Sequence, residues 1–154
     1  MLALCILAVA LLSGCLGIKA PPVSRPVIPA VYVDYQRTGG IAGLNDRLVI
    51  FDNGAGLVSG RNINKEITLN QSELDAISRN FNTARFPSLE PSYTSRGGGA
   101  DLIQYTITFG NKTVTTEDSA IPPRLQPVID ELNQVLRRGL ASEPATGFPG
   151  NLTP

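Results

Sequence analysis

The residues of this chain that could do chemistry are few, and their types exclude most enzyme mechanisms. The sequence contains no histidine, the commonest general base and metal ligand in proteins. Its 13 aspartates and glutamates follow no spacing that predicts two carboxylates on one surface, as acid–base catalysis requires. It has no Ser–His pair, no His/Cys zinc cluster and no phosphate-binding loop. We therefore predict no catalytic residue, no bound metal and no cofactor.

Charge and length narrow the class of protein further. Lysine and arginine also number 13, so the formal net charge of zero creates no field that would attract nucleic acid. A length of 154 residues and a hydrophobic content of 42% are typical of one ordinary globular domain. We expect a monomer that does not bind nucleic acid.

Cys15 has the clearest chemical role. The uncharged apolar run from Leu2 to Leu12 is too short to span a bilayer, which takes about 20 residues, but it suits a signal peptide. It ends in LSGC at residues 12–15, which resembles the lipobox of prokaryotic lipoproteins. The resemblance implies that the Cys15 thiolate takes a diacylglycerol and that the chain is cut before it. Since Cys5 would leave with the signal, the mature protein would contain neither a free thiol nor a disulfide.

The remaining chain divides by composition. We expect a signal peptide at 1–14, a lipidated cysteine with a proline-rich tether at 15–29, a folded domain at 30–139 and a disordered tail at 140–154. Proline favours extended backbone, so the tether is expected to be semi-rigid. The protein is thus predicted to be exported and lipid-anchored to the prokaryotic cell envelope, at the outer membrane if the host has one.

The segment SRGGGAD at residues 95–101 is the most unusual sequence in the domain. Three glycines precede an acidic residue and then a regular strand pattern. Fixing each glycine costs roughly 0.5–1 kcal/mol of conformational freedom, which a simple connector has no need to incur. Chemistry alone leaves two interpretations of this segment equally open. It is either a flexible connector or a loop whose backbone enters a narrow groove on a partner protein.

The elements that would position this segment follow from hydrophobic periodicity and turn residues. Asn70 and Glu73 predict a capping box at the start of a helix, and Gly110-Asn111 predicts a hairpin with Val114 opposite Ile107. The third strand is poorly marked at 59–64, where a bulge or a loop is possible. The expected order is strand 31–36, strand 47–52, strand 57–69, helix 70–82, strand 101–109, strand 112–117 and helix 122–138. We predict an α+β fold, with an antiparallel sheet of four to five strands and both helices on one face.

A further set of residues is spread over about 34–137. It comprises YQRTGGIAG at 35–43, GGAD at 98–101, Gln104-Tyr105, Pro122-Pro123, Leu125, Pro127 and Leu132. In their order and spacing these residues resemble the emfourin-like family, prokaryotic protein inhibitors of thermolysin-type (protealysin-like) metalloproteases. The sequence departs from the family in its lipid signal, its tether and its long third-strand region.

The resemblance implies a lipid-anchored inhibitor that binds tightly and non-covalently at the cleft of a thermolysin-like zinc protease. The zinc would belong to the target, and the membrane would be contacted only through the lipid. The alternative is a lipid-anchored binding or scaffold module of the cell envelope without protease inhibition. The candidate contact residues implied by the resemblance are Arg96, Gly97, Gly98, Gly99, Ala100 and Asp101, with Gly39 and Gly40 as a second, weaker set.

Overall fold

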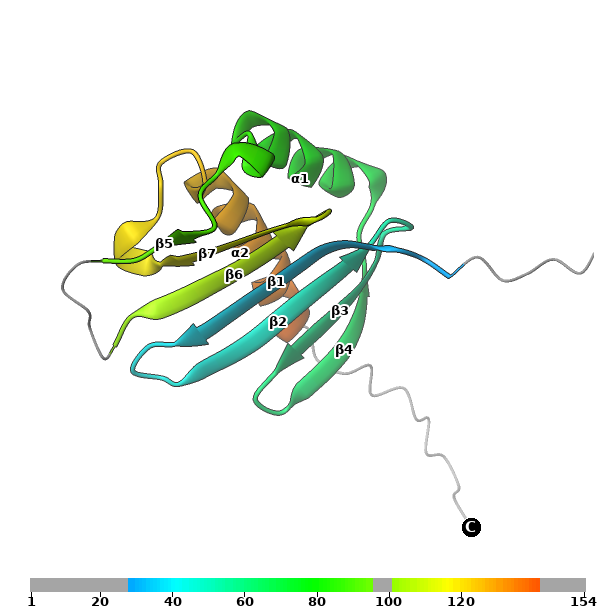
Figure 1. The fold of residues 1–154 in the computed structure, drawn as a ribbon. Helices are drawn as coiled ribbons and strands as arrows, with labels where there is room; N and C mark the ends of the chain where they lie inside the picture. The colour runs from blue at the N-terminus through cyan, green and yellow to red at the C-terminus, as the bar shows by residue number, and fades with distance from the viewer. Residues whose placement is uncertain (1–27, 96–100, 142–154) are drawn as a thin grey trace, which may run out of the picture.

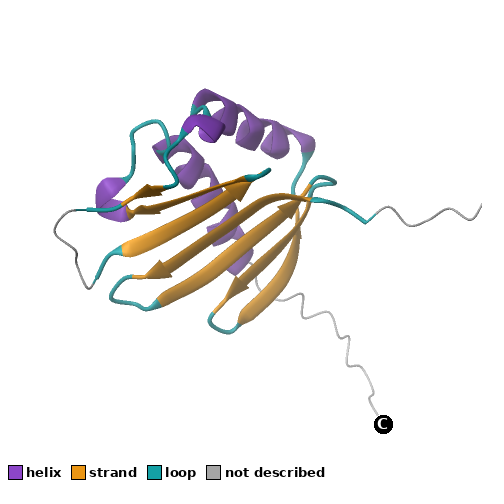
Figure 2. Cartoon of the chain, in the orientation of Figure 1, coloured by secondary structure: helices purple, strands orange, loops and turns teal. Residues whose placement is uncertain are grey.

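The domain is one seven-stranded sheet with two helices packed on one of its faces (Figures 1 and 2). The computed structural model describes residues 28–95 and 101–141. The strand order across the sheet is β4-β3-β2-β1-β6-β7-β5. The elements are β1 (Val31–Gly39), β2 (Leu44–Phe51), β3 (Ala55–Gly60), β4 (Ile63–Thr68), α1 (Gln71–Thr83), β5 (Ser92–Tyr93), β6 (Ile103–Phe109), β7 (Lys112–Glu117) and α2 (Gln126–Ala141), with short 3-10 turns at Phe86–Ser88 and Asp118–Ala120.

The prediction of an antiparallel sheet of four to five strands is wrong. The sheet has seven strands, and its β5–β7 pair is parallel. The poorly marked region of the expected third strand is a complete hairpin, β3 and β4, which reverses at Arg61 and Asn62. The strand β5 is only two residues long, too short for any alternating pattern to be recognised in the sequence.

The core lies between the sheet and the helices. β1 is the central strand, antiparallel to β2 on one side and to β6 on the other. Its side chains alternate, so Val33 and Tyr35 are fully buried under the helices. Gly139 of α2 lies so close to β3 that a Cβ there would be 2.6 Å from a Val58 methyl carbon. That proximity brings the helix backbone directly onto the sheet.

Local signals set both helix starts. The capping box is confirmed, because the Asn70 side chain accepts from the Glu73 amide at 3.1 Å and Glu73 accepts from the Asn70 amide at 2.8 Å. The last helix begins at Gln126, not at Pro122, since a separate turn closes first from the Leu125 amide to the Pro122 carbonyl. It was also expected to stop before Gly139, but it continues to Ala141 because Gly139 packs on β3.

The predicted hairpin between β6 and β7 is confirmed, with Ile107 opposite Val114. The face of the sheet away from the helices carries mainly polar side chains, among them Thr106 and Thr108 of β6 opposite Thr115 and Thr113 of β7. None of the helices in the described part of the chain combines the length and the apolar character needed to cross a membrane.

Candidate functional site

Three connections meet at one end of the sheet, and we call this end the loop edge. It comprises the β1–β2 turn at residues 39–43, the β3–β4 turn at 61–62, and the described ends of the β5–β6 connection, Ser95 and residues 101–102 (Figure 1). The strands β1 and β6 run side by side to this end, where Gly39 is paired with Ile103. Segments more than 60 residues apart in the chain are therefore neighbours here.

The β1–β2 turn depends on glycine. Gly39, Gly40 and Gly43 have φ values of +90°, +69° and +58°, which other residues rarely adopt. A Cβ on Gly39 would lie 2.6 Å from the Leu102 carbonyl oxygen. The Gly40 amide donates to that same oxygen at 3.1 Å. Glycine at these two positions therefore allows the turn to lie directly against the start of β6.

Both described ends of the β5–β6 connection are held by acidic residues. The Ser95 amide and hydroxyl donate to Glu117 Oε2 at 2.9 and 3.0 Å. The Ile103 amide donates to Asp118 Oδ2 at 3.3 Å. The base of the glycine segment is thus fixed on both sides, by the end of β7 and by the residue that follows it.

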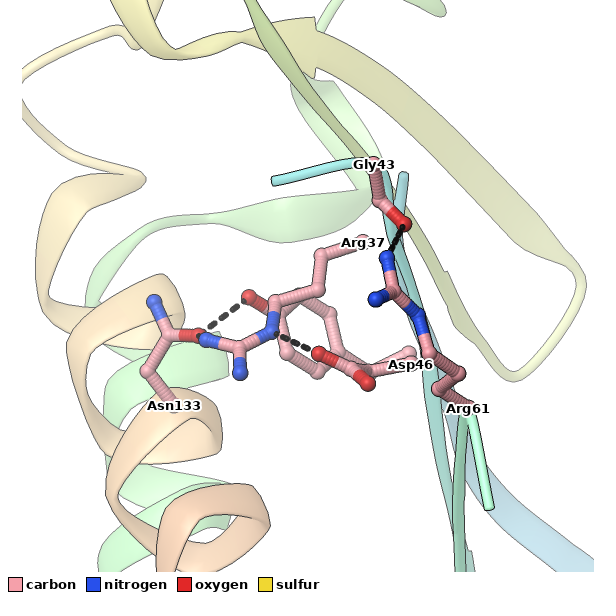
Figure 3. A network of polar contacts seen from close by, with 6 residues as sticks. Arg37, Gly43, Asp46, Arg61 and Asn133 are labelled. Atoms are coloured by element: carbon pink, nitrogen blue, oxygen red, sulfur yellow. Dashed lines mark hydrogen bonds and ion pairs between the residues drawn. The ribbon is translucent and has the colours of Figure 1, made fainter. Parts of the chain in front are cut away.

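Arg61 ties the β3–β4 turn to the β1–β2 turn. Its Nη2 atom donates to the Ala42 carbonyl oxygen at 2.7 Å and makes a longer contact of 3.5 Å to the Gly43 carbonyl oxygen (Figure 3). Within the turn, the Gly43 amide donates to the Gly40 carbonyl at 2.9 Å. The backbone of this turn is therefore hydrogen-bonded within itself, to Leu102 just before β6, and to Arg61 of the neighbouring hairpin.

A polar network lies beneath the loop edge, between β1, β2 and α2 (Figure 3). Asn133 Oδ1 accepts from the Tyr35 hydroxyl at 2.9 Å and from Arg37 Nη1 at 3.2 Å. Arg37 Nε donates to Asp46 Oδ2 at 2.8 Å. Burial, with a smaller contribution from Tyr105, raises the pKa of Tyr35 well above its usual value, so Tyr35 remains a hydrogen-bond donor. The network joins α2 to the strands that carry the turn.

The structure brings together part of the set of residues predicted from the sequence. Gly39 and Gly40 adjoin Leu102, the residue after Asp101, and Asp101 is exposed. The other predicted residues lie outside the described residues: Cys15, Arg96, Gly97, Gly98, Gly99 and Ala100.

Two residues of the site were missed by sequence reasoning. Arg61 was unassigned and Asp46 was counted only as one of many acids. If β3 and β4 had been recognised as a hairpin, Arg61 would have been assigned to its turn. The contact of Arg61 with Ala42 would still not have been predicted. Asp46 stands directly opposite Arg37 in the β1–β2 register, a pairing that was also visible only with the register in hand.

The chemistry available at the loop edge is that of backbone groups held in turns. Across residues 28–95 and 101–141, no group of three or more histidine, cysteine, aspartate or glutamate side chains could hold a metal ion. The glycines of the loop edge allow another backbone to approach closely. A hollow of about 280 Å³, lined by Tyr32, Asp52 and residues of α1, lies beyond the opposite end of the β1–β2 hairpin.

Comparison with known proteins adds no relative. No protein-family model matches the chain, and no curated protein sequence matches it. The function must therefore be inferred from the residues and their geometry.

Proposed function

We propose that this protein is a lipid-anchored inhibitor of a thermolysin- or protealysin-like zinc metalloprotease, which it blocks by tight non-covalent binding at the cleft. One observation carries the proposal: the Gly40 amide donates to the carbonyl of Leu102, the residue that follows the segment 95–101, so the β1–β2 turn lies at the base of that segment. The resemblance of residues 34–137 to emfourin-like inhibitors supports the choice of target. The segment 95–101 supplies the principal contact, and the β1–β2 turn supplies the second.

The size of a stable interface explains why two adjacent segments are needed. Specific protein complexes bury about 800 Å² on each partner, more than one short glycine loop offers. The β1–β2 turn lies beside Leu102 at the base of that loop, and the β3–β4 turn lies beside the β1–β2 turn, so both extend the contact surface. A glycine backbone can enter a protease cleft without presenting a side chain for cleavage, and the base of the loop is held by Glu117 and Asp118.

The direction of β1 suits an anchored inhibitor. This strand of nine residues begins at Val31, close after the proposed tether, and ends at Gly39 in the loop edge. At about 3.3 Å per residue, the strand separates these two residues by roughly 26 Å. If Cys15 carries the lipid, the loop edge lies at the end of the domain farther from the tether. A protease outside the membrane could reach it there.

Inhibition assays with purified residues 20–154 test the proposal. The wild-type domain should inhibit thermolysin or protealysin at stoichiometric concentrations. Gly98→Trp should abolish inhibition by placing a bulky side chain in the contact loop, while the melting temperature stays unchanged. Asn111→Trp places the same side chain in the exposed β6–β7 turn at the opposite end of the sheet and should inhibit normally.

Two results would count against it. If the folded wild-type domain inhibits neither enzyme, the protein is better described as an envelope binding or scaffold module. If Gly98→Trp inhibits as well as wild type, inhibition does not use the glycine segment.

A further inference from the structure

Ile41 is the most exposed large hydrophobic residue among the described residues. Its relative exposure is 89%, and it occupies the tip of the β1–β2 turn. Its neighbours in the turn are Gly40, Ala42 and Gly43, so it is the only side chain there larger than a methyl group. An isolated exposed apolar residue is ordinary on a protein surface. The surroundings of Ile41 are less ordinary, because its neighbours along the chain are glycine and alanine and its own side chain protrudes from the turn.

The backbone on both sides of Ile41 is held by hydrogen bonds. The Gly40 amide donates to the Leu102 carbonyl, the Gly43 amide donates to the Gly40 carbonyl, and Arg61 donates to the Ala42 carbonyl. The partners are the residue before β6, the turn itself and the β3–β4 turn. A turn whose backbone is held in place before binding loses less conformational freedom when a complex forms, which favours affinity.

We propose that Ile41 is an apolar anchor that inserts into an apolar socket beside the cleft of the target protease, and that Arg61 is the residue that positions it. This inference rests on the proposed function and adds the residue that supplies much of the binding energy. Interface energy is concentrated in a few side chains that fill well-packed, desolvated pockets. Ile41 is exposed and apolar, and it lies in a hydrogen-bonded turn beside Leu102, as such an anchor requires.

Ile28 provides a matched control. Its relative exposure is 86%, but it precedes β1 and lies at the opposite end of that strand from the loop edge. Ile41→Asp and Ile28→Asp therefore make the same chemical change at nearly equal exposure. Neither substitution removes a buried contact, so both variants should fold with the wild-type melting temperature.

The experiment measures the inhibition constants of wild type, Ile41→Asp, Ile41→Val and Ile28→Asp against purified thermolysin and protealysin. We expect Ile41→Asp to weaken inhibition by about 30-fold or more, the scale of an interface hot spot. Ile41→Val, which removes one methylene group, should raise the inhibition constant about 3-fold. Ile28→Asp should raise it less than about 2-fold.

The outcomes separate the two proposals. If wild type inhibits and Ile41→Asp inhibits equally well, the anchor is overturned while the proposed function stands. If Ile28→Asp weakens inhibition as much as Ile41→Asp, the effect is not specific to the turn and the anchor is again overturned. If wild type inhibits neither enzyme, both proposals fail.

The positioning role of Arg61 has its own readout. Arg61→Ala should accelerate hydrogen exchange at the Gly43 amide and weaken inhibition by roughly 3- to 10-fold, because the turn loses its bond at Ala42. Arg61→Lys keeps a cationic donor, so it should retain part of the protection from exchange and part of the inhibition. Unchanged exchange and inhibition in Arg61→Ala would overturn the positioning role.

Discussion

Two arginine–aspartate pairs connect the same two strands, β1 and β2, on opposite faces of the sheet. Arg37 and Asp46 pair on the helix face, where their side chains are 16% and 10% exposed. Arg47 and Asp34 pair on the open face, where they are 53% and 29% exposed. The outer pair has two hydrogen bonds, at 2.8 and 2.6 Å, whereas the inner pair has one at 2.8 Å.

Burial, not the number of hydrogen bonds, should decide which pair matters more. If one partner of the outer pair is removed, water can solvate the other. If one partner of the inner pair is removed, a charge is left in a place that water reaches poorly, and Asn133 also loses a donor. The inner pair therefore holds the strands beneath the loop edge, while the outer pair contributes little.

The largest expected effect comes from the inner pair. Arg37→Ala should lower the free energy of unfolding by about 2–4 kcal/mol, because it leaves Asp46 without its partner. Arg47→Ala, the same change on the open face, should lower it by less than about 1 kcal/mol. Urea unfolding at neutral pH measures both. Equal losses would contradict the role given to burial.

The second effect is a pH dependence of the inner network. Since the pKa of Tyr35 is raised from its ordinary value of 10.0, the folded state keeps a proton that the unfolded state releases above that pH. Stability should therefore fall as pH rises above 10, at up to about 1.4 kcal/mol per pH unit for one proton. Urea unfolding between pH 8 and 11 measures this slope.

Tyr35→Phe is the control for this slope. It should be less stable at pH 8, because it lacks the bond to Asn133, but its stability should fall less steeply with pH. A slope identical to that of wild type would contradict the assignment.

An ion pair of intermediate exposure lies between the helices. Arg138 of α2 donates to Glu73 of α1, and their side chains are 50% and 20% exposed. Although burial alone would raise the pKa of Glu73, the bonds from Arg138 and from the Asn70 amide hold it below its ordinary value. This contribution to stability is therefore present above pH 4.5 and is lost as pH falls below it.

Glu73→Gln tests the size of this intermediate case. Glutamine can still accept the Asn70 amide, so the capping box remains while the charge is lost. Between pH 6 and 3, wild type should lose about 0.5–1 kcal/mol more stability than Glu73→Gln, as measured by urea unfolding. If this difference in stability were as large as the loss caused by Arg37→Ala, the expected order of the three ion pairs by burial would be wrong.

The smallest effect belongs to the outer pair. Asp34→Ala should cost a few tenths of a kcal/mol at low ionic strength, and the cost should vanish near 1 M NaCl, where charges are screened beyond about 3 Å. The loss caused by Arg37→Ala should persist in the same salt. Denaturation by urea at two NaCl concentrations separates the two cases, and a salt-independent cost for Asp34→Ala would contradict its surface character.

Much of the local structure was predictable because its causes are local. Asn70 and Glu73 are three residues apart, so their capping box is visible in the chain. Gly110 and Asn111 marked the turn that sets the register of β6 and β7. The strand count was wrong for the opposite reason. β3 and β4 gain their stability from pairing with each other, and the edge strand β4 has only Ile63 and Ile67 as apolar residues, too weak a pattern to separate it from β3.

The candidate site shows the same division. Gly39 and Gly40 were singled out as candidate contact residues, and their positive φ values place them in a tight turn. Their contact with Leu102, the Arg61 bond to Ala42 and the burial of Arg37 with Asp46 were not predicted. Each of these contacts depends on how the strands and turns pack in space, which the spacing of the residues along the chain does not reveal.

The sequence by itself determined the capping box of α1, the turn between β6 and β7, the strand character of β1, and the chemistry that excludes histidine-based catalysis. Only the tertiary structure decided that β1 lies between β2 and β6, and that its end meets the start of β6. The physical reason is that caps and turns depend on neighbours a few residues away. Strand order and the loop edge depend instead on which hydrophobic faces can be buried together, a property of the whole chain.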